Sequence, residues 1–249
     1  MPTPTLLLIR PAARIPADAA LCRRAGWQPV PFPLIRIAAE PTALAGLPAQ
    51  MQQAAAVVWI SPSAVETALS ACSGSLSHLT QPQIAVGGGT AQALRQAGFA
   101  NIISPPGGHD SEAVLALPWW HTLGKGSCIL IIRGAHGRHL LPDALCQRGF
   151  QVACADIYQR LPIEPDWAVF HTAQPAAAWI TSAEQVRLLF AAVPASLAQR
   201  LQSLLYFAHH PRIAQALSQA GAARIRLLDS AAELESALIA ERQNPPQAT

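Results

Sequence analysis

The chain has 249 residues, of which 51% are hydrophobic and 12% are charged. This is enough apolar material for one large core or for two cores of about 120 residues each, and it excludes an intrinsically disordered chain. Apolar residues come in short runs such as Leu6–Ile9 and Ala54–Ile60, whereas a membrane-spanning helix needs about 18 or more. Met1–Thr5 carries no basic segment and Arg10 interrupts the apolar stretch that follows, so we expect no secretory signal and a cytoplasmic location.

The formal net charge of +3 is small, and the 17 Lys and Arg residues, nearly all arginine, are scattered along the chain. Scattered arginines do not form a nucleic-acid-binding stripe, but they suit bidentate recognition of carboxylates or phosphates. We therefore expect a small anionic ligand and no nucleic-acid partner. The odd number of cysteines and the lack of C-x-x-C pairs predict reduced core residues at Cys22, Cys72, Cys128, Cys146 and Cys154.

The first elements predict a parallel α/β fold. Thr5–Ile9 has the continuous apolar character of a buried strand, Ala17–Ala25 has helical spacing, and Gln28–Pro31 opens another strand. The same pattern recurs in Cys128–Ile132, Leu141–Arg148 and Gln151–Ile157. Buried strands that alternate with helices indicate parallel sheets, whose ligands bind beyond the carboxyl ends of the strands. Residues directly after each apolar run are therefore candidate site residues, and Arg10 is the first of them.

Two more predicted strand ends carry hydroxyl groups or glycines. Ser61 and Ser63 follow the apolar run that ends at Ile60, although helix N-capping alone would explain both. Gly87-Gly88-Gly89-Thr90 lies between a predicted strand and a predicted helix, so its backbone N–H groups and the Thr90 hydroxyl suit an anion. The segment matches neither the dinucleotide fingerprint nor the P-loop. A glycine-rich turn with Thr90 as N-cap is the structural alternative.

The middle of the chain adds hydroxyl and cationic candidates. Ser111 begins a predicted helix after a proline- and glycine-rich loop. Arg133 and Gly134 end an apolar run, and Arg138 lies in the loop that follows, which also holds two histidines. Those histidines have no acidic or thiol companion nearby, so we expect no metal site. Tyr158 stands at the end of the predicted strand that leads into the proposed crossing between domains, where its phenol could face the gap between them, although an isolated tyrosine usually packs in a core.

An internal repeat indicates two similar domains. Ala91–Ile102 recurs as Ala214–Ile225, about 123 residues later. In the second copy, Thr181-Ser182 stands where the first has Ser61, and His210 and Arg212 stand where the first has glycines. A tandem duplication would place the boundary near Gly124. Alternatively, residues of roughly 40–157 form a domain inserted into the other one, and the repeat alone does not choose between these arrangements.

Taken in order, these segments make the chain resemble the uroporphyrinogen-III synthase family over nearly its whole length. The resemblance rests on Arg10-Pro11, Trp59–Val65, Val86–Ala91, Pro105–Glu112, Ile132–Gly134 and Tyr158. One departure is Ala208–Ile213, which replaces a second V-G-x-x-T-A segment. The role of the family's threonine there cannot be carried over to this chain.

The resemblance implies two parallel-sheet α/β domains joined by a two-stranded linker, with the substrate in the cleft between them. One domain would combine residues 1–37 and 166–249, the inserted one would span 40–157, and the linkers would lie near 33–41 and 158–165. The implied reaction converts hydroxymethylbilane, a linear tetrapyrrole with eight carboxylates, to uroporphyrinogen III. The reaction releases water, inverts ring D and needs no cofactor. We expect the protein to act as a monomer without a membrane or nucleic-acid partner.

The resemblance also assigns site roles. Tyr158 would assist departure of the hydroxyl group as the catalytic residue. The substrate-binding residues would be Arg10, Ser61, Ser63, Gly87, Gly88, Gly89, Thr90, Ser111, Arg133, Gly134, Arg138, Thr181, Ser182, His210 and Arg212. The competing interpretation is a non-catalytic two-domain α/β module that binds an anionic small molecule, which the departure at His210 and Arg212 leaves open.

Overall fold

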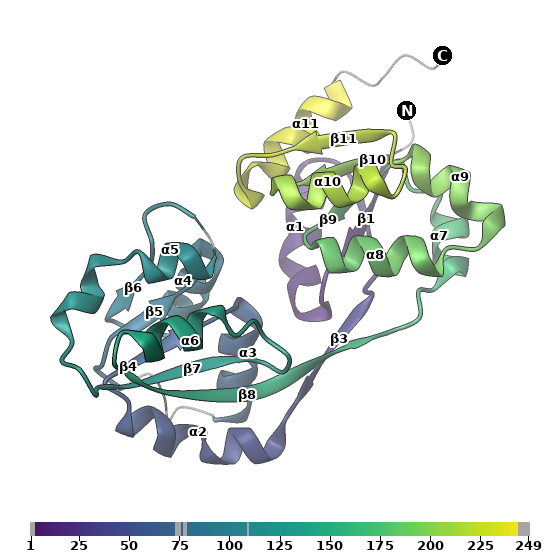
Figure 1. Ribbon diagram of the computed structural model, residues 1–249. Coiled ribbons are helices and arrows are strands. Elements are labelled where there is room, and N and C mark those ends of the chain that lie inside the picture. The colour runs from purple at the N-terminus through teal and green to yellow at the C-terminus, as the bar shows by residue number, and fades with distance from the viewer. Residues whose placement is uncertain (1–2, 73–75, 77–78, 109, 244–249) are drawn as a thin grey trace. The chain divides into compact units, whose positions relative to one another are not determined.

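The computed structural model describes residues 3–72, 76, 79–108 and 110–243 (Figure 1). The chain divides into two compact units, one made of Met1–Arg36 with Leu161–Thr249 and the other of Ile37–Arg160. It passes from the first unit to the second along β3 (Ile35–Ala39) and returns along β8 (Gln151–Pro162). These two strands are hydrogen-bonded neighbours. Gly124 lies within the second unit.

The first unit is built around a sheet with the strand order β11-β10-β9-β1-β2. The neighbouring pairs β1/β2, β1/β9, β9/β10 and β10/β11 are all parallel. Its strands are β1 (Thr5–Ile9), β2 (Gln28–Pro31), β9 (Ala177–Ile180), β10 (Leu205–Ala208) and β11 (Arg224–Leu227). Its α-helices are α1 (Ile15–Arg24), α7 (Trp167–Ala173), α8 (Ala183–Ala192), α9 (Ala195–Ser203), α10 (Pro211–Gln219) and α11 (Leu234–Gln243).

The second unit has the strand order β3-β8-β7-β4-β5-β6, and β4/β5, β4/β7, β5/β6 and β7/β8 pair in parallel. Its remaining strands are β4 (Ala56–Trp59), β5 (Gln83–Ala85), β6 (Ile102–Ile103) and β7 (Cys128–Gly134). Its α-helices are α2 (Pro41–Gln53), α3 (Pro62–Ala71), α4 (Gly88–Gln96), α5 (Ser111–Leu115) and α6 (Leu140–Gln147). Short 3-10 helices complete the two units at Ala12–Arg14, Pro118–Thr122 and Ala231–Glu233.

Both faces of each sheet are buried, which explains the unbroken apolar runs of the sequence. In β1, Leu7 and Ile9 pack on one face against α7, α8, α9 and α10, while Leu6 and Leu8 pack on the other against α1 and α11. The second sheet packs against α2, α3 and α4 on one face and against α5 and α6 on the other. The predicted α/β class with parallel sheets is confirmed. The predicted helix limits are off by one or two residues, since α1 and α6 each start earlier.

The prediction that the cysteines are core residues is partly wrong. All five cysteines are free. Cys22 is buried, but Cys146 and Cys154 are exposed. In α6, Leu141 and Leu145 face the sheet, so Cys146, the next residue, points elsewhere. Within the part of the chain that the structure describes, no helix has both the length and the apolar character to cross a membrane.

Candidate active site

The carboxyl end of β4 begins the site in the second unit. Ser61 adopts an extended backbone and caps α3, since its Oγ accepts a hydrogen bond of 3.1 Å from the backbone N–H of Ala64. Pro62 occupies the first turn of that helix, where its missing N–H costs no hydrogen bond. The capping role considered for Ser61 is therefore correct. Ser63 lies half-buried one position further along α3.

Tyr158 meets Ser61 through its hydroxyl group. The Tyr158 Oη lies 2.9 Å from Ser61 Oγ, and the two residues are 1% and 8% exposed. The prediction that the strand ends at Ile157 is wrong, because β8 continues to Pro162 and Tyr158 lies within it.

A β-bulge in β8 determines the direction of Tyr158. Arg133 of β7 pairs with Asp156, but the next residue, Gly134, pairs with Tyr158, so Ile157 is an extra residue in the ladder. A bulge of this kind re-aims the side chain that follows it. As a result, Tyr158 packs in the same cluster as Ala155 and Trp59.

Gly134 gives the Tyr158 ring its space. A Cβ atom at Gly134 would lie 2.6 Å from Cε2 and 2.7 Å from Cζ of Tyr158, closer than real Cβ contacts come. The ring therefore lies directly against the backbone of Gly134. This contact gives Gly134 a steric role beside the ligand contact expected from the sequence.

The glycine segment after β5 has a different character. Gly87, with φ of −158°, is the N-cap of α4, and Thr90 is the third residue of the helix rather than its cap. Gly88 and Gly89 are exposed, and a Cβ at Gly88 would meet nothing within 4 Å. At Gly89 the nearest atom would be Pro62 Cγ at 3.6 Å, an ordinary contact. Nothing in the fold requires glycine at these two positions, and their open backbone suits close approach of an anion to the helix N-terminus.

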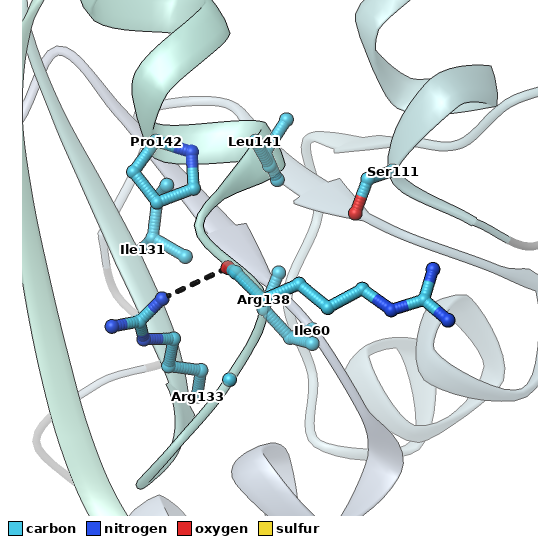
Figure 2. A pocket seen from close by; sticks show the side chains of 8 residues that line it. Ile60, Ser111, Ile131, Arg133, Arg138, Leu141 and Pro142 are labelled. Carbon is cyan, nitrogen blue, oxygen red and sulfur yellow. Dashed lines mark hydrogen bonds between the residues drawn. The ribbon is translucent and has the colours of Figure 1, made fainter.

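A pocket of about 200 Å³ lies on the other face of the same sheet (Figure 2). It is lined by Ile60, Ser111, Ile131, Arg133, Gly137, Arg138, Leu141 and Pro142. Ile60, Ile131 and Leu141 belong to the apolar cluster under α5 and α6. In Figure 2, the Arg138 side chain extends toward Ser111, which is the first residue of α5. The pocket therefore joins an apolar wall to a cation and a hydroxyl group.

Arg133 holds the loop at the rim of this pocket. Its Nε donates to Asp156 Oδ1 at 2.7 Å, and its Nη1 donates to the Arg138 carbonyl oxygen at 3.2 Å. Arg133 is 8% exposed. These bonds commit much of the guanidinium to the chain itself, so Arg133 fixes the loop that presents Arg138. Sequence reasoning missed Asp156, because a carboxylate on a neighbouring strand has no local signal.

The corresponding edge of the first unit is built on Asp18. Asp18 Oδ2 accepts hydrogen bonds from Arg10 Nη1 at 2.9 Å and from Trp179 Nε1 at 3.2 Å. The Arg10 guanidinium carbon also lies 5.9 Å from the centre of the Trp179 ring, and the His209 ring lies 5.4 Å from that ring. Burial raises the pKa of the Asp18 carboxyl, and the charge of Arg10 opposes this rise. Arg10 is thus part of an ion pair at its strand end.

The other candidates of the first unit lie at helix N-termini. Ser182 caps α8, since its Oγ accepts from the Gln185 backbone N–H at 3.1 Å, and Thr181 precedes it at the end of β9. His210 caps α10 through Nδ1, which accepts from the Arg212 backbone N–H at 3.1 Å. The departure from the family pattern thus places an imidazole where the first copy of the repeat has a glycine N-cap.

The structure brings together some of the expected site residues. Tyr158 contacts Ser61 and Gly134, and Ser111, Arg133 and Arg138 share the pocket. The others lie at separate places: Ser63 in α3, Gly87–Thr90 at the start of α4, Arg10 after β1, Thr181 and Ser182 after β9, and His210 and Arg212 at the start of α10. Among the described residues, no group of three or more His, Cys, Asp or Glu side chains is placed to hold a metal ion.

These features define a class: a protein of two parallel α/β units with hydroxyl groups, helix N-termini and arginines near the ends of the strands. Residues 17–233 match the family model described as uroporphyrinogen-III synthase HemD. Because this match covers most of the chain, the chain belongs to the uroporphyrinogen-III synthase family.

Curated relatives agree over part of the chain. It is 33% identical over 119 residues to uroporphyrinogen-III synthase of Escherichia coli (strain K12), a match that covers 44% of this chain and 46% of that protein. The Salmonella typhimurium (strain LT2) enzyme of the same name is 34% identical over 114 residues, with the same coverage. The matched region thus spans about half the length of these relatives.

Solved structures share the fold over almost the full length. A mutant uroporphyrinogen III synthase of the extremely thermophilic bacterium Thermus thermophilus aligns with a TM-score of 0.60 at 22% identity and covers 97% of this chain and 98% of that one. The uroporphyrinogen-III synthetase of Helicobacter pylori 26695 aligns with a TM-score of 0.62 at 16% identity, covering 95% and 99%. At these identities the likeness concerns the fold.

Proposed function

We propose that the chain converts hydroxymethylbilane to uroporphyrinogen III, as a lyase of tetrapyrrole biosynthesis that uses no added cofactor. The family match over residues 17–233 carries this proposal. In the reaction, the bond between the terminal carbon and its hydroxyl oxygen breaks, and the oxygen leaves as water after it accepts a proton. The electron pair of the adjacent pyrrole nitrogen stabilises the carbon that remains. The protein therefore needs to fold a flexible substrate and supply one proton donor.

Tyr158 is the proposed proton donor. It is the side chain that the family resemblance selects, and its hydroxyl lies beside Ser61 at the carboxyl end of β4. A phenol that gives its proton to the departing hydroxide acts mainly in the transition state, so it should influence kcat more than KM.

The carboxylates of the substrate are the proposed ligands of the remaining groups. In the second unit, Ser63, the N–H groups of Gly87, Gly88 and Gly89, the Thr90 hydroxyl, Ser111 and Arg138 would bind them. In the first unit, the proposed ligands are Arg10, Thr181, Ser182, His210 and Arg212. Arg133 and Gly134 would serve the site through the contacts that fix the pocket loop and the Tyr158 ring. The pocket, below the roughly 300–1,000 Å³ of sites for whole drug-sized ligands, suits one part of a larger ligand.

We further propose that the two compact units are the two domains of a cytoplasmic, monomeric enzyme that binds neither nucleic acid nor membranes. The test of the proposed activity is turnover of freshly generated hydroxymethylbilane by chain dialysed against a chelator, with no nucleotide present. We expect consumption of the substrate at a rate proportional to protein concentration, and a lower rate for Tyr158→Phe at a temperature at which both chains remain folded. A rate that equals the spontaneous one would refute the activity.

A further inference from the structure

We infer that Ser61 is a positioning residue for Tyr158: its hydroxyl donates a hydrogen bond to Tyr158 Oη and thereby directs the phenol proton toward the substrate. The inference rests on the proposed function and adds to it a partner for the proton donor. It starts from the 2.9 Å contact between Ser61 Oγ and Tyr158 Oη, which joins residues 97 positions apart.

Either hydroxyl can be the donor in the bond between Ser61 Oγ and Tyr158 Oη, and the proposed reaction selects one of the two directions. A serine hydroxyl has one hydrogen to donate and two lone pairs to accept with. One lone pair already accepts from the Ala64 N–H at 3.1 Å, and Ser61 is 8% exposed. A second lone pair and the hydrogen remain for the contact with Tyr158. If Tyr158 gives its proton to the substrate, its hydrogen points away from Ser61, so in the reactive state we infer that the hydrogen of Ser61 is donated to Tyr158 Oη. Tyr158 then keeps its own hydrogen for another acceptor.

The surroundings of the ring fix the place of Tyr158 Oη. The bulge at Ile157 turns the side chain toward β4, and the ring lies against Gly134, where even a methyl group would come within 3.1 Å of Oη. With the ring held on this side, the bond to Ser61 sets the remaining freedom, which is rotation of the phenol O–H. Ser61 is held in turn by its cap of α3.

The bond has a chemical consequence for the proposed reaction. When Tyr158 transfers its proton to the departing hydroxide, water leaves and a phenolate forms. A hydrogen bond donated by Ser61 stabilises that phenolate, so it is stronger in the transition state than in the ground state. The proton that the attacking ring carbon loses when the macrocycle closes balances the one given up by Tyr158.

Three variants separate this role from capping. Ser61→Thr keeps both the cap and the hydroxyl, and Ser61→Gly removes the hydroxyl while glycine remains an acceptable N-cap. Tyr158→Phe removes the other partner. We expect Ser61→Gly to lower kcat by roughly 2- to 12-fold with little change in KM, the range that corresponds to one hydrogen bond. Ser61→Thr should restore most of the loss, and Ser61→Gly should have no further effect in the Tyr158→Phe background.

The second tyrosine provides a readout that does not depend on activity. The chain has two tyrosines, and Tyr206, which belongs to the other unit, donates to the Leu201 carbonyl oxygen at 2.9 Å. When Cζ of both tyrosines is labelled with ¹³C, the spectrum contains two tyrosine signals. The signal that disappears in the Tyr206→Phe variant belongs to Tyr206, and the other belongs to Tyr158. Ser61→Gly should shift the Tyr158 signal and leave that of Tyr206 in place.

Two results would overturn the inference alone. One is a wild-type enzyme that is active while Ser61→Gly and Tyr158→Phe reduce kcat independently, so that their effects multiply. The other is a rise in KM at unchanged kcat for Ser61→Gly, which would make Ser61 a substrate ligand. A wild-type chain without turnover would instead overturn the proposed function and this role with it, even if the Tyr158 signal shifts.

Discussion

Replacement of Gly134 by alanine is the sharpest test of how the Tyr158 ring is held. The new Cβ would lie 2.6 Å from Tyr158 Cε2, about 0.8 Å short of the 3.4 Å at which ordinary contacts begin. Gly134 is in a β-strand without a left-handed φ, so the cost is steric rather than conformational. The ring or the strand must move by most of that distance.

The size of this movement predicts the effect. The bond from Tyr158 Oη to Ser61 Oγ is 2.9 Å long, and a ring shift of about 0.8 Å would stretch it beyond hydrogen-bond range. Overpacking of a core costs about 1–3 kcal/mol, and the lost hydrogen bond adds about 1 kcal/mol. For a chain of this size, each kcal/mol lowers Tm by about 2–4 °C. We expect a lower Tm together with a lower kcat for Gly134→Ala.

Thermal unfolding and steady-state turnover on one preparation measure both effects, and Gly88→Ala is the matched control for stability. A Cβ at Gly88 meets nothing within 4 Å, so this helix substitution should leave Tm unchanged or raise it. If the exposed backbone at Gly88 binds a substrate carboxylate, the KM of Gly88→Ala should rise. A Gly134→Ala variant with wild-type Tm and kcat would refute the account of the Tyr158 ring.

Three further predictions follow from the ion pairs and the hydroxyl groups. Tyr158→Phe should lower kcat more than loss of any single serine or threonine hydroxyl of the site, by up to the 10²-fold lower end of general-acid effects; an unchanged kcat would remove Tyr158 from the reaction. Arg133→Lys and Asp156→Asn should both raise KM, because each disrupts the hydrogen bonds through which Arg133 holds the pocket loop. If only Arg133→Lys raises KM, Arg133 contacts the substrate directly instead. Asp18 and Glu235 should oppose each other in pH-dependent unfolding. The pKa of Asp18 is raised in the folded state, so the contribution of this group to the free energy of unfolding is complete below pH 3.8 and is lost as the pH rises through the folded-state pKa. Arg24 lowers the pKa of Glu235, so the contribution of Glu235 is present above pH 4.5 and is lost as the pH falls through its folded-state pKa. Asp18→Asn and Glu235→Gln should each remove one of these slopes, and slopes of the same sign would contradict the assignment.

Local sequence signals predicted the parts of the site that depend on neighbouring residues. A buried strand followed by a polar residue and a proline or alanine is enough to place Ser61 and Ser182 at helix N-termini, and both are there. The same signal misplaced the cap of α4, because Gly87 has no side chain to mark it and Thr90 does. Glycine is acceptable at an N-cap, so composition alone could not separate the two.

Contacts between distant residues could not be predicted in this way. Arg10 pairs with Asp18, and Arg133 pairs with Asp156. No sequence pattern marks either aspartate as a partner, because only the fold brings it to the strand end. Because of the bulge at Ile157, side chains of β8 no longer alternate strictly between the two faces of the sheet, and a prediction from that alternation is wrong at Tyr158. The steric role of Gly134 depends on that bulge and has no local signal either.

The isomer distribution of the product tests the central claim most directly. Spontaneous closure of hydroxymethylbilane gives the type I macrocycle, whereas closure with inversion of ring D gives type III. The account predicts that type III rises with the concentration of wild-type chain and falls toward the spontaneous mixture in Tyr158→Phe, when the oxidised porphyrins are separated by chromatography. Type I alone, at protein concentrations that bind all the substrate, would contradict it.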